Sequence, residues 1–275
     1  MNFNKKKFPL IDIYDEVIRG RPIKPLTLSL KSSAGKSSLT GQITVRHRGG
    51  GHSKRYRLID FTRPYSHLPA LVIRFEKDPN RSVFIALTLS RNGYLSYIIA
   101  AHRLWPGCLV RTVKEFPSTI QASSVYPLYA LPVGLMLHNL QFTRGDKFKA
   151  VRAAGVHALL LKQHWAGTIV RMPSTEVRLF PYNSVGSAGM LSNPCWDIGR
   201  TLVKAGQSRW LGRRPSVRGV AMNPIDHPHG GGQGKTAGGR ASSTTPWGRL
   251  TKGKKTRVKP VSKSVVTLRV KRKSF

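Results

Sequence analysis

Hydrophobic and polar positions along the chain predict short β-strands in two regions. In the first, residues 37–117, runs rich in β-branched and aromatic residues are separated by turn signals such as Asp78-Pro79-Asn80 and Arg91-Asn92-Gly93. The predicted strands are Leu39–Val45, Arg55–Phe61, Leu71–Phe75, Val83–Leu89 and Tyr94–Ala100. Short strands at this regular spacing favour a five-stranded barrel of the oligonucleotide-binding (OB) type.

The second region, residues 131–200, follows a linker at 118–130 that contains Pro and Ser. Its predicted strands are His138–Phe142, His157–Lys162, Gly167–Met172 and Glu176–Phe180. Strands this short suit an SH3-like barrel. Tyr182–Pro194 is rich in turn signals, and a short helix is predicted at Ile198–Ala205, with Gly206 as its C-terminal stop.

The two ends of the chain show no sustained hydrophobic period. Residues 1–36 are interpreted as a basic N-terminal arm with one short helical piece near Ile11–Ile18. In residues 201–275, Gly, Pro, Arg and Lys dominate, and the only acid is Asp226. A free segment of that composition cannot bury enough apolar surface to offset the entropy lost on ordering. We therefore expect an extended C-terminal segment that is ordered by a strongly anionic partner.

Net charge indicates the chemistry of that partner. The 275 residues include 47 Lys and Arg and 11 Asp and Glu, which gives a net charge of +36. The cations are spread along the whole chain, which favours a protein embedded in nucleic acid over an enzyme with a basic arm. An anionic membrane is a weaker alternative, since no apolar run is long enough for a span. We expect neither a membrane partner nor a homo-oligomer.

Targeting and cysteine signals are weak. Lys5, Lys6 and Lys7 are followed closely by acids, which transit peptides avoid, so no import leader is expected. Cys108 and Cys195 lie 87 residues apart and no Cys-x-x-Cys occurs, so a zinc site is not expected. We expect no cofactor and no protein-held metal, apart from Mg²⁺ that accompanies RNA.

A glycine-rich basic segment covers Arg46–Arg57. The glycines at 49–51 let the backbone approach a phosphate chain closely, and cations flank them on both sides. Tyr56 is suited to stack on a base or sugar. The alternative is a flexible basic hairpin tip, but the net charge favours contact with nucleic acid. A metal site at His47 and His52 lacks carboxylate or Cys companions.

Arginines and lysines elsewhere suit two kinds of phosphate contact. Arginine forks bind phosphate bidentately and stack on bases, whereas the lysines of 252–257 form a point-charge cluster. At 150–155, small residues surround one Arg. They either permit close approach of the backbone to RNA or form only a tight turn at the start of a strand. The residues predicted to bind RNA are Arg46, His47, Arg48, Gly49, Gly50, Gly51, His52, Lys54, Arg55, Arg57, Arg81, Arg152, Lys204, Arg209, Trp210, Arg213, Arg214, Arg218, Asn223, His227, His229, Gly230, Gly231, Lys235, Trp247, Lys252, Lys254, Lys255 and Arg257.

The run Asp226-His227-Pro228-His229 has the composition of a catalytic or metal-binding site. An Asp can orient a His that acts as a general base, and two His can share a metal. No second carboxylate or Cys lies nearby in the sequence, and 11 acids in the whole chain leave few other partners. A His ring is also a good RNA ligand, so we expect RNA contact and no catalytic residue. Gly35-Lys36-Ser37 and Gly234-Lys235-Thr236 each lack the leading Gly of a phosphate loop.

Several motifs together resemble the L2 family of universal large-subunit ribosomal proteins. The longest extends from Arg213 to Gly232 and includes Ala221-Met222-Asn223-Pro224 and Asp226-His227-Pro228-His229. Further matching motifs are Arg46–His52, Tyr56-Arg57, Asp78–Ser82, Thr245–Gly248 and Thr251–Arg257. The resemblance covers residues 41–257.

This resemblance implies an OB barrel followed by an SH3-like barrel, with extended arms bound to large-subunit rRNA near the subunit interface. It implies support of assembly, subunit association and the peptidyl-transferase centre, toward which the loop with His227 and His229 points. Bond formation in the family is attributed to RNA. The implied partners are large-subunit rRNA, neighbouring ribosomal proteins and the small subunit. Residues 28–36 are similar to mitochondrial or alpha-proteobacterial members, so the mitochondrial matrix is expected, with bacterial cytoplasm as the alternative.

Some features depart from the family pattern. These are the 63–69 loop and three tryptophans, Trp105, Trp165 and Trp196. Extra aromatic surface would suit docking of organelle-specific ribosomal proteins, a hypothesis that fails if all three rings lie inside the barrels. Two other functions stay open. A free RNA chaperone would bind many RNAs with similar affinity, and a metal-dependent nuclease would use Asp226 and the two nearby histidines.

Overall fold

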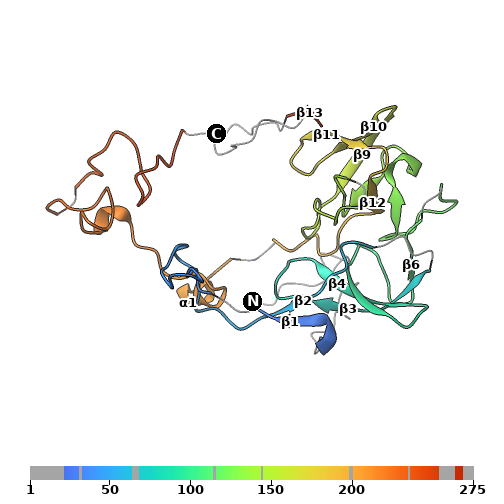
Figure 1. Cartoon of the computed structure of the whole chain (residues 1–275), viewed down its shortest axis with the longest axis horizontal. Helices are drawn as coiled ribbons and strands as arrows, with labels where there is room; N and C mark the ends of the chain where they lie inside the picture. Colours follow the sequence, from blue (N-terminus) through green and yellow to red (C-terminus); the bar gives the residue numbers. More distant parts are fainter. Residues whose placement is uncertain are drawn as a thin grey trace. The chain divides into compact units, whose positions relative to one another are not determined.

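The computed structural model describes residues 22–30, 33–63, 68–113, 116–143, 145–197, 201–234, 236–253 and 264–268. They divide into two compact units. Unit 1 comprises the described residues within 1–30, 54–200 and 262–275, and unit 2 those within 31–53 and 201–261. The predicted mostly β fold, with an OB barrel followed by an SH3-like barrel, is confirmed (Figure 1).

The first barrel of unit 1 contains a four-stranded antiparallel sheet in the order β5-β4-β3-β6. Its strands and the adjoining β2 are β2 (Arg55–Arg57), β3 (Ala70–Lys77), β4 (Phe84–Ser90), β5 (Leu95–Ile99) and β6 (Leu109–Val110). A parallel bridge between Ile59 and Tyr97 attaches the segment after β2 to β5. Val72, Ile85 and Ile99 are buried, and this burial fixes the register because a slip of one residue would expose them.

One predicted strand of this region is wrong. Leu39–Val45 contains a single isolated bridge, between Ile43 and Lys36, instead of a strand. The alternation of Leu39, Ile43 and Val45 has no core to face, and Leu39 is 93% exposed. A short strand that is not among the predicted ones, β1 (Thr27–Ser29), pairs antiparallel with β2 and follows a 3₁₀ turn at Lys24–Leu26.

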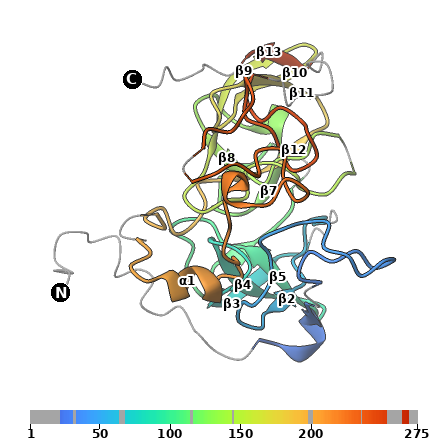
Figure 2. The same cartoon turned by 90° about the vertical axis from the view of Figure 1, so that its left-hand side faces the viewer.

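The second barrel of unit 1 is a seven-stranded sheet in the order β13-β11-β10-β9-β8-β12-β7. The strands are β7 (Val125–Pro127), β8 (Met136–His138), β9 (Ala158–His164), β10 (Gly167–Arg171), β11 (Val177–Pro181), β12 (Val185–Ala188) and β13 (Val265–Thr267), with a 3₁₀ turn at Leu128–Ala130. Figure 2 shows β9, β10, β11 and β13 side by side. Leu137, Leu160 and Phe180 form part of the buried core.

Two elements of the second barrel differ from the prediction. The strand expected at His138–Phe142 ends instead at His138, because Asn139 adopts a left-handed φ of +49°. Val185–Ala188, expected to be turn-rich, forms a fully buried strand. Its small residues fill a tight space, since a Cβ on Gly186 would lie 2.6 Å from a methyl group of Leu140.

Unit 2 has little regular structure. The elements in its described residues are the helix α1 (Ala205–Trp210) and a 3₁₀ turn at Gly219–Ala221. The prediction of a helix at Ile198–Ala205 is wrong for its described part, residues 201–205. The helix α1 begins at Ala205, where the predicted helix ends, and Gly206 lies inside α1. The Gln207 side chain accepts hydrogen bonds from the Val203 and Lys204 amides, which fixes the start of α1. Ile11–Ile18 lies outside the described residues. Among the described residues, no helix has the length and apolar character needed to cross a membrane.

Candidate nucleic-acid interface

Unit 2 carries positive charge that forms no ion pair within the described part of the chain. Its sequence ranges contain 17 Lys and Arg and one acid, Asp226. The ion pairs found among the described residues all lie in unit 1, and join Arg74 to Glu76, Arg81 to Asp78, Lys149 to Asp146 and Arg178 to Glu176. A surface of this charge is suited to a polyanion.

Two distant segments of unit 2 pair with each other as an antiparallel ribbon. Backbone hydrogen bonds of 3.0, 3.2 and 3.2 Å run from the amides of Gly49, Arg214 and His52 to the carbonyls of Gly212, His47 and Trp210, respectively. Arg48 and Arg213 are bridge partners between the first two bonds. We call residues 47–52 and 210–214 the glycine ribbon. It brings together two groups of predicted RNA-binding residues.

Glycine is needed where the two backbones of the ribbon meet. A Cβ on Gly51 would lie 2.8 Å from both Cα and N of Gly212, closer than real side chains approach a backbone. Gly49 and Gly212 have φ of +117° and +84°, a region that other residues rarely adopt. The sequence predicts that Gly51 lets the backbone approach a phosphate closely. In the structure, the missing side chain of Gly51 lets residues 210–214 approach closely.

Exposed cations and rings surround the glycine ribbon. The exposed arginines are Arg46, Arg48, Arg209, Arg213 and Arg214. The guanidinium carbon of Arg46 lies 5.7 Å from the centroid of the Trp247 ring, a cation–π distance. Trp210 and Trp247 are 65% and 68% exposed, so their rings can stack on unpaired bases.

His227 and His229 are hydrogen-bonded within unit 2. The Thr244 amide donates to Nε2 of His229 over 2.8 Å, and Nδ1 of His229 lies 2.7 Å from the Gly238 carbonyl. Because an amide only donates and a carbonyl only accepts, His229 carries its proton on Nδ1. The His229 amide donates to Nδ1 of His227 over 3.0 Å, and the two rings stack at 5.2 Å. Both nitrogens of His229 are therefore occupied.

The neighbouring predicted residues define the turn around this histidine pair. The Asn223 carbonyl accepts from the amides of Asp226 and His227. A Cβ on Gly230 would meet the Asn223 carbonyl, and Gly231 has a φ of +86°. Lys204, Arg218 and Lys252 are exposed elsewhere in unit 2.

A second cationic cluster lies in unit 1. Arg152 and Arg81 place their guanidinium carbons 4.9 and 5.9 Å from the centroid of the Phe61 ring, and Arg81 also lies 5.6 Å from the Tyr56 ring. The Arg81–Asp78 ion pair of 2.6 Å holds Arg81 in place. The structure thus joins Arg81 and Arg152, which are 71 positions apart in the sequence.

The remaining predicted cations of unit 1 differ in exposure. Arg55 is exposed and Lys54 is half-buried. Arg57 is only 7% exposed, and its Nη1 donates to the Arg55 carbonyl over 3.2 Å. Arg57 therefore offers a ligand little surface.

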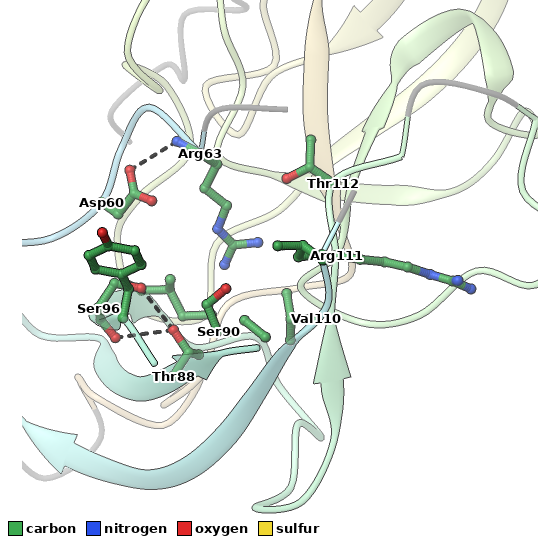
Figure 3. Close-up of a pocket in the computed structure, with 12 residues that line it drawn as sticks. Asp60, Arg63, Thr88, Ser90, Ser96, Val110, Arg111 and Thr112 are labelled. Atoms are coloured by element: carbon green, nitrogen blue, oxygen red, sulfur yellow. Dashed lines mark hydrogen bonds between the residues drawn. The ribbon is translucent and has the colours of Figure 1, made fainter. Parts of the chain in front are cut away.

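Sequence reasoning missed Arg63. Its guanidinium end is buried beside a cavity of about 230 Å³ that Thr88, Ser90 and Thr112 help to line (Figure 3). Nη1 donates to the Ser123 carbonyl over 2.5 Å, whereas Nη2 finds no partner among the described residues. Burial lowers the pKa of Arg63 to about 10, an effect that Asp60 partly offsets. No local sequence motif marks a single buried Arg, so pattern reasoning cannot identify it.

Four predicted residues, Lys235, Lys254, Lys255 and Arg257, lie outside the described residues. Within the described ranges, no three His, Cys, Asp or Glu side chains gather as a metal-ligand group. Trp165 and Trp105 are 87% and 49% exposed and Trp196 is half-buried, so these rings do not all lie inside the barrels.

Comparison with known proteins covers both regions. The family described as Ribosomal Proteins L2, RNA binding N-terminal domain, matches residues 23–112, and Ribosomal Proteins L2, C-terminal domain, matches residues 121–248. Large ribosomal subunit protein uL2m of Reclinomonas americana is 47% identical over 256 residues, 93% of this chain and 91% of that protein. Large ribosomal subunit protein uL2 of Parvibaculum lavamentivorans is 44% identical over 256 residues, 93% and 90% of the two chains. The chain belongs to the ribosomal protein L2 family.

Proposed function

We propose that this chain is a structural component of the large ribosomal subunit and that it binds the rRNA of that subunit. The observation that carries the proposal is the family match across residues 23–112 and 121–248. Unit 2 supports it, because its exposed arginines have a single acid within the unit to pair with. The role is architectural: Lys and Arg neutralise phosphates so that RNA helices can pack closely.

High-salt sucrose-gradient sedimentation of a native lysate tests this function. We expect the chain to migrate only with large subunits and monosomes, because many charge-assisted contacts act together. A chain that stays at the top of the gradient, or that salt strips readily, would instead support a free RNA chaperone.

We also propose that unit 2 lies near the peptidyl-transferase centre and the subunit interface. The support is the resemblance of the motif at 213–232 to the family. A hydroxyl-radical probe tethered at Gln233→Cys, in a chain whose two native cysteines are replaced by Ser, tests this position. Cleavage of rRNA around that centre is expected, and cleavage confined to distant helices would refute the position.

The proposed compartment is the mitochondrial matrix, with bacterial cytoplasm as the rival. The support is the relative named uL2m from Reclinomonas americana, although bacterial relatives are nearly as similar. Cell fractionation decides between them: the chain should sediment with mitochondrial ribosomes, and its recovery in cytoplasmic ribosomes would refute a mitochondrial role. We propose neighbouring ribosomal proteins, the small subunit and RNA-associated Mg²⁺ as further partners, without a cofactor, a membrane or a second copy.

A further inference from the structure

The glycine ribbon is built by the chain's own hydrogen bonds. Its three backbone bonds of 3.0–3.2 Å join residues 47–52 to 210–214, and the Gly51–Gly212 approach leaves no room for a side chain. The ribbon is therefore defined by contacts that do not involve a ligand. The pairing places the two segments side by side, so one partner can contact both.

The exposed edge of the ribbon combines two kinds of donor. Gly50 and Gly51 are exposed, and their amides donate to no backbone carbonyl among the described residues. Arg48 and Arg213 are exposed at the facing positions of the bridge. Backbone amides and arginine forks are both suited to the oxygens of a phosphate group.

Among the described residues, these arginines form no ion pair. Asp226 is the single acid in the sequence of unit 2, and the ion pairs of the described residues all lie in unit 1. An apolar partner would leave these cations without counter-charges, and a small anion would engage only part of the edge. A continuous chain of phosphates can neutralise all of them.

We propose that the glycine ribbon is a single composite site for the sugar–phosphate backbone of RNA, formed before the RNA binds. This inference rests on the proposed function and deepens it, because it makes two distant motifs one binding element. A consequence is energetic coupling: loss of the pairing should reduce the contribution of arginines on both segments without removing any charge.

The first experiment measures the affinity of the full chain for large-subunit rRNA over a series of salt concentrations. The test variant is Gly51→Ala, and the matched control is Gly206→Ala, at a position in α1 with nothing within 4 Å of the added Cβ. Each lost phosphate contact makes the slope of log K against log salt shallower by about 0.7–0.9. We expect Gly51→Ala to lose two or more such contacts, and Gly206→Ala to keep the parent slope.

Arg213→Gln, made in the parent and in Gly51→Ala, completes a double-mutant cycle of binding free energies. A composite site predicts that Arg213→Gln weakens binding less in the Gly51→Ala background than in the parent. Equal losses in both backgrounds, together with an unchanged slope for Gly51→Ala, would overturn the composite site. Failure of the parent chain itself to bind the rRNA would refute the proposed function.

A second experiment tests preformation directly and does not depend on Gly51→Ala folding. Arg48 and Arg213 form a non-hydrogen-bonded pair, for which the Cα atoms are about 4.5 Å apart, within disulfide range. In a chain without its native cysteines, the thiols of Arg48→Cys with Arg213→Cys should form an intramolecular disulfide in the absence of RNA when oxidised glutathione is added, which takes up the two electrons and two protons and leaves as reduced glutathione. Concentrated urea should abolish this preference. A cross-link that forms only when RNA is present would show that the ribbon is not preformed.

Discussion

His229 uses both ring nitrogens within unit 2, and this limits what it can do for a ligand. Nε2 accepts from the Thr244 amide and Nδ1 donates to the Gly238 carbonyl. A Cβ on Gly238 would lie 2.8 Å from the ring, so the loop is closed tightly around it. The sequence around His229 has the composition of a metal or general-base site. In the structure, the His229 ring instead joins segments 229–231 and 238–244 through its hydrogen bonds.

His229→Ala should therefore loosen this loop. The substitution leaves the Thr244 amide without its acceptor, and a lost buried partner costs about 1–3 kcal/mol. Hydrogen exchange of the free chain should show faster exchange of the Thr244 amide by roughly ten- to hundredfold. His47→Ala is the control, because His47 takes part in the ribbon through its backbone carbonyl. Unchanged Thr244 exchange in His229→Ala would contradict the role assigned to the ring.

His138 should make the stability of unit 1 fall in mild acid. It is fully buried, its Nδ1 donates to the Gly189 carbonyl over 2.8 Å, and burial lowers its pKa to about 4. The unfolded chain takes up this proton near pH 6.5 and the folded chain only near pH 4, so stability is lost as the pH falls through that window. The loss reaches about 3 kcal/mol. Urea unfolding at pH 7 and pH 4.5 should show a smaller pH effect in His138→Asn, which cannot become charged; equal pH effects would refute this cause.

Arg213→Ala with Arg218→Ala should impair assembly of the large subunit. Both side chains are exposed in unit 2 and removal of each subtracts one candidate phosphate contact. The gradient profile should show fewer complete large subunits while the free chain keeps its thermal stability. Normal assembly by the double variant would show that these arginines are dispensable.

Among the elements, strands with strong alternation and clear turns were predictable. β4 (Phe84–Ser90) and β9 (Ala158–His164) lie within two residues of their predicted ends, because turn residues bound runs that alternate or are apolar. β12 was missed because Val185–Ala188 is built largely of small residues, which carry no β signal until packing is known. The helix α1 was misplaced because Gly206 was interpreted as a stop, whereas the Gln207 side chain sets its start.

The pairing of the two segments of the glycine ribbon could not be predicted from the sequence. Motif resemblance identified both segments of the glycine ribbon, but no pattern along the chain indicated that Arg48 faces Arg213. Arg81 and Arg152 likewise meet on Phe61 only in the folded barrels. Such pairings depend on contacts between residues far apart in sequence, which periodicity does not report.

Gly167, which begins β10, and Gly134, which precedes β8, give a matched pair of glycine tests for unit 1. Gly167 has φ +145°, and a Cβ there would collide with the Phe180 carbonyl of β11, whereas Gly134 has φ +87° and open space around it. Both substitutions by Ala strain the backbone, and Gly167→Ala adds a clash worth roughly 1–3 kcal/mol. Denaturant unfolding should rank Gly167→Ala as the less stable variant. Equal stabilities would mean that β10 and β11 separate easily.

At the scale of the whole molecule, repulsion among the positive charges opposes folding of the chain when no RNA is bound. The chain has a net charge of +36, so its positive side chains repel one another. Salt screens this repulsion, because the Debye length falls from about 10 Å at 0.1 M to about 3 Å at 1 M. The melting temperature of the RNA-free chain should therefore rise with NaCl, while its affinity for rRNA falls. A melting temperature that is flat or decreases with NaCl would indicate that self-repulsion does not limit stability.

The pairing of residues 47–52 with 210–214 also sets an order of events during synthesis. The 157 residues from Ser53 to Arg209 must be translated before the second segment exists. At about 5–20 residues per second, this delay is roughly 8–30 s. A nascent chain thus contains the first barrel of unit 1 and every strand of the second barrel except β13 before its ribbon can close. An interrupted translation product would carry the first basic motif alone, and so would compete poorly with finished chains for a place in a growing subunit.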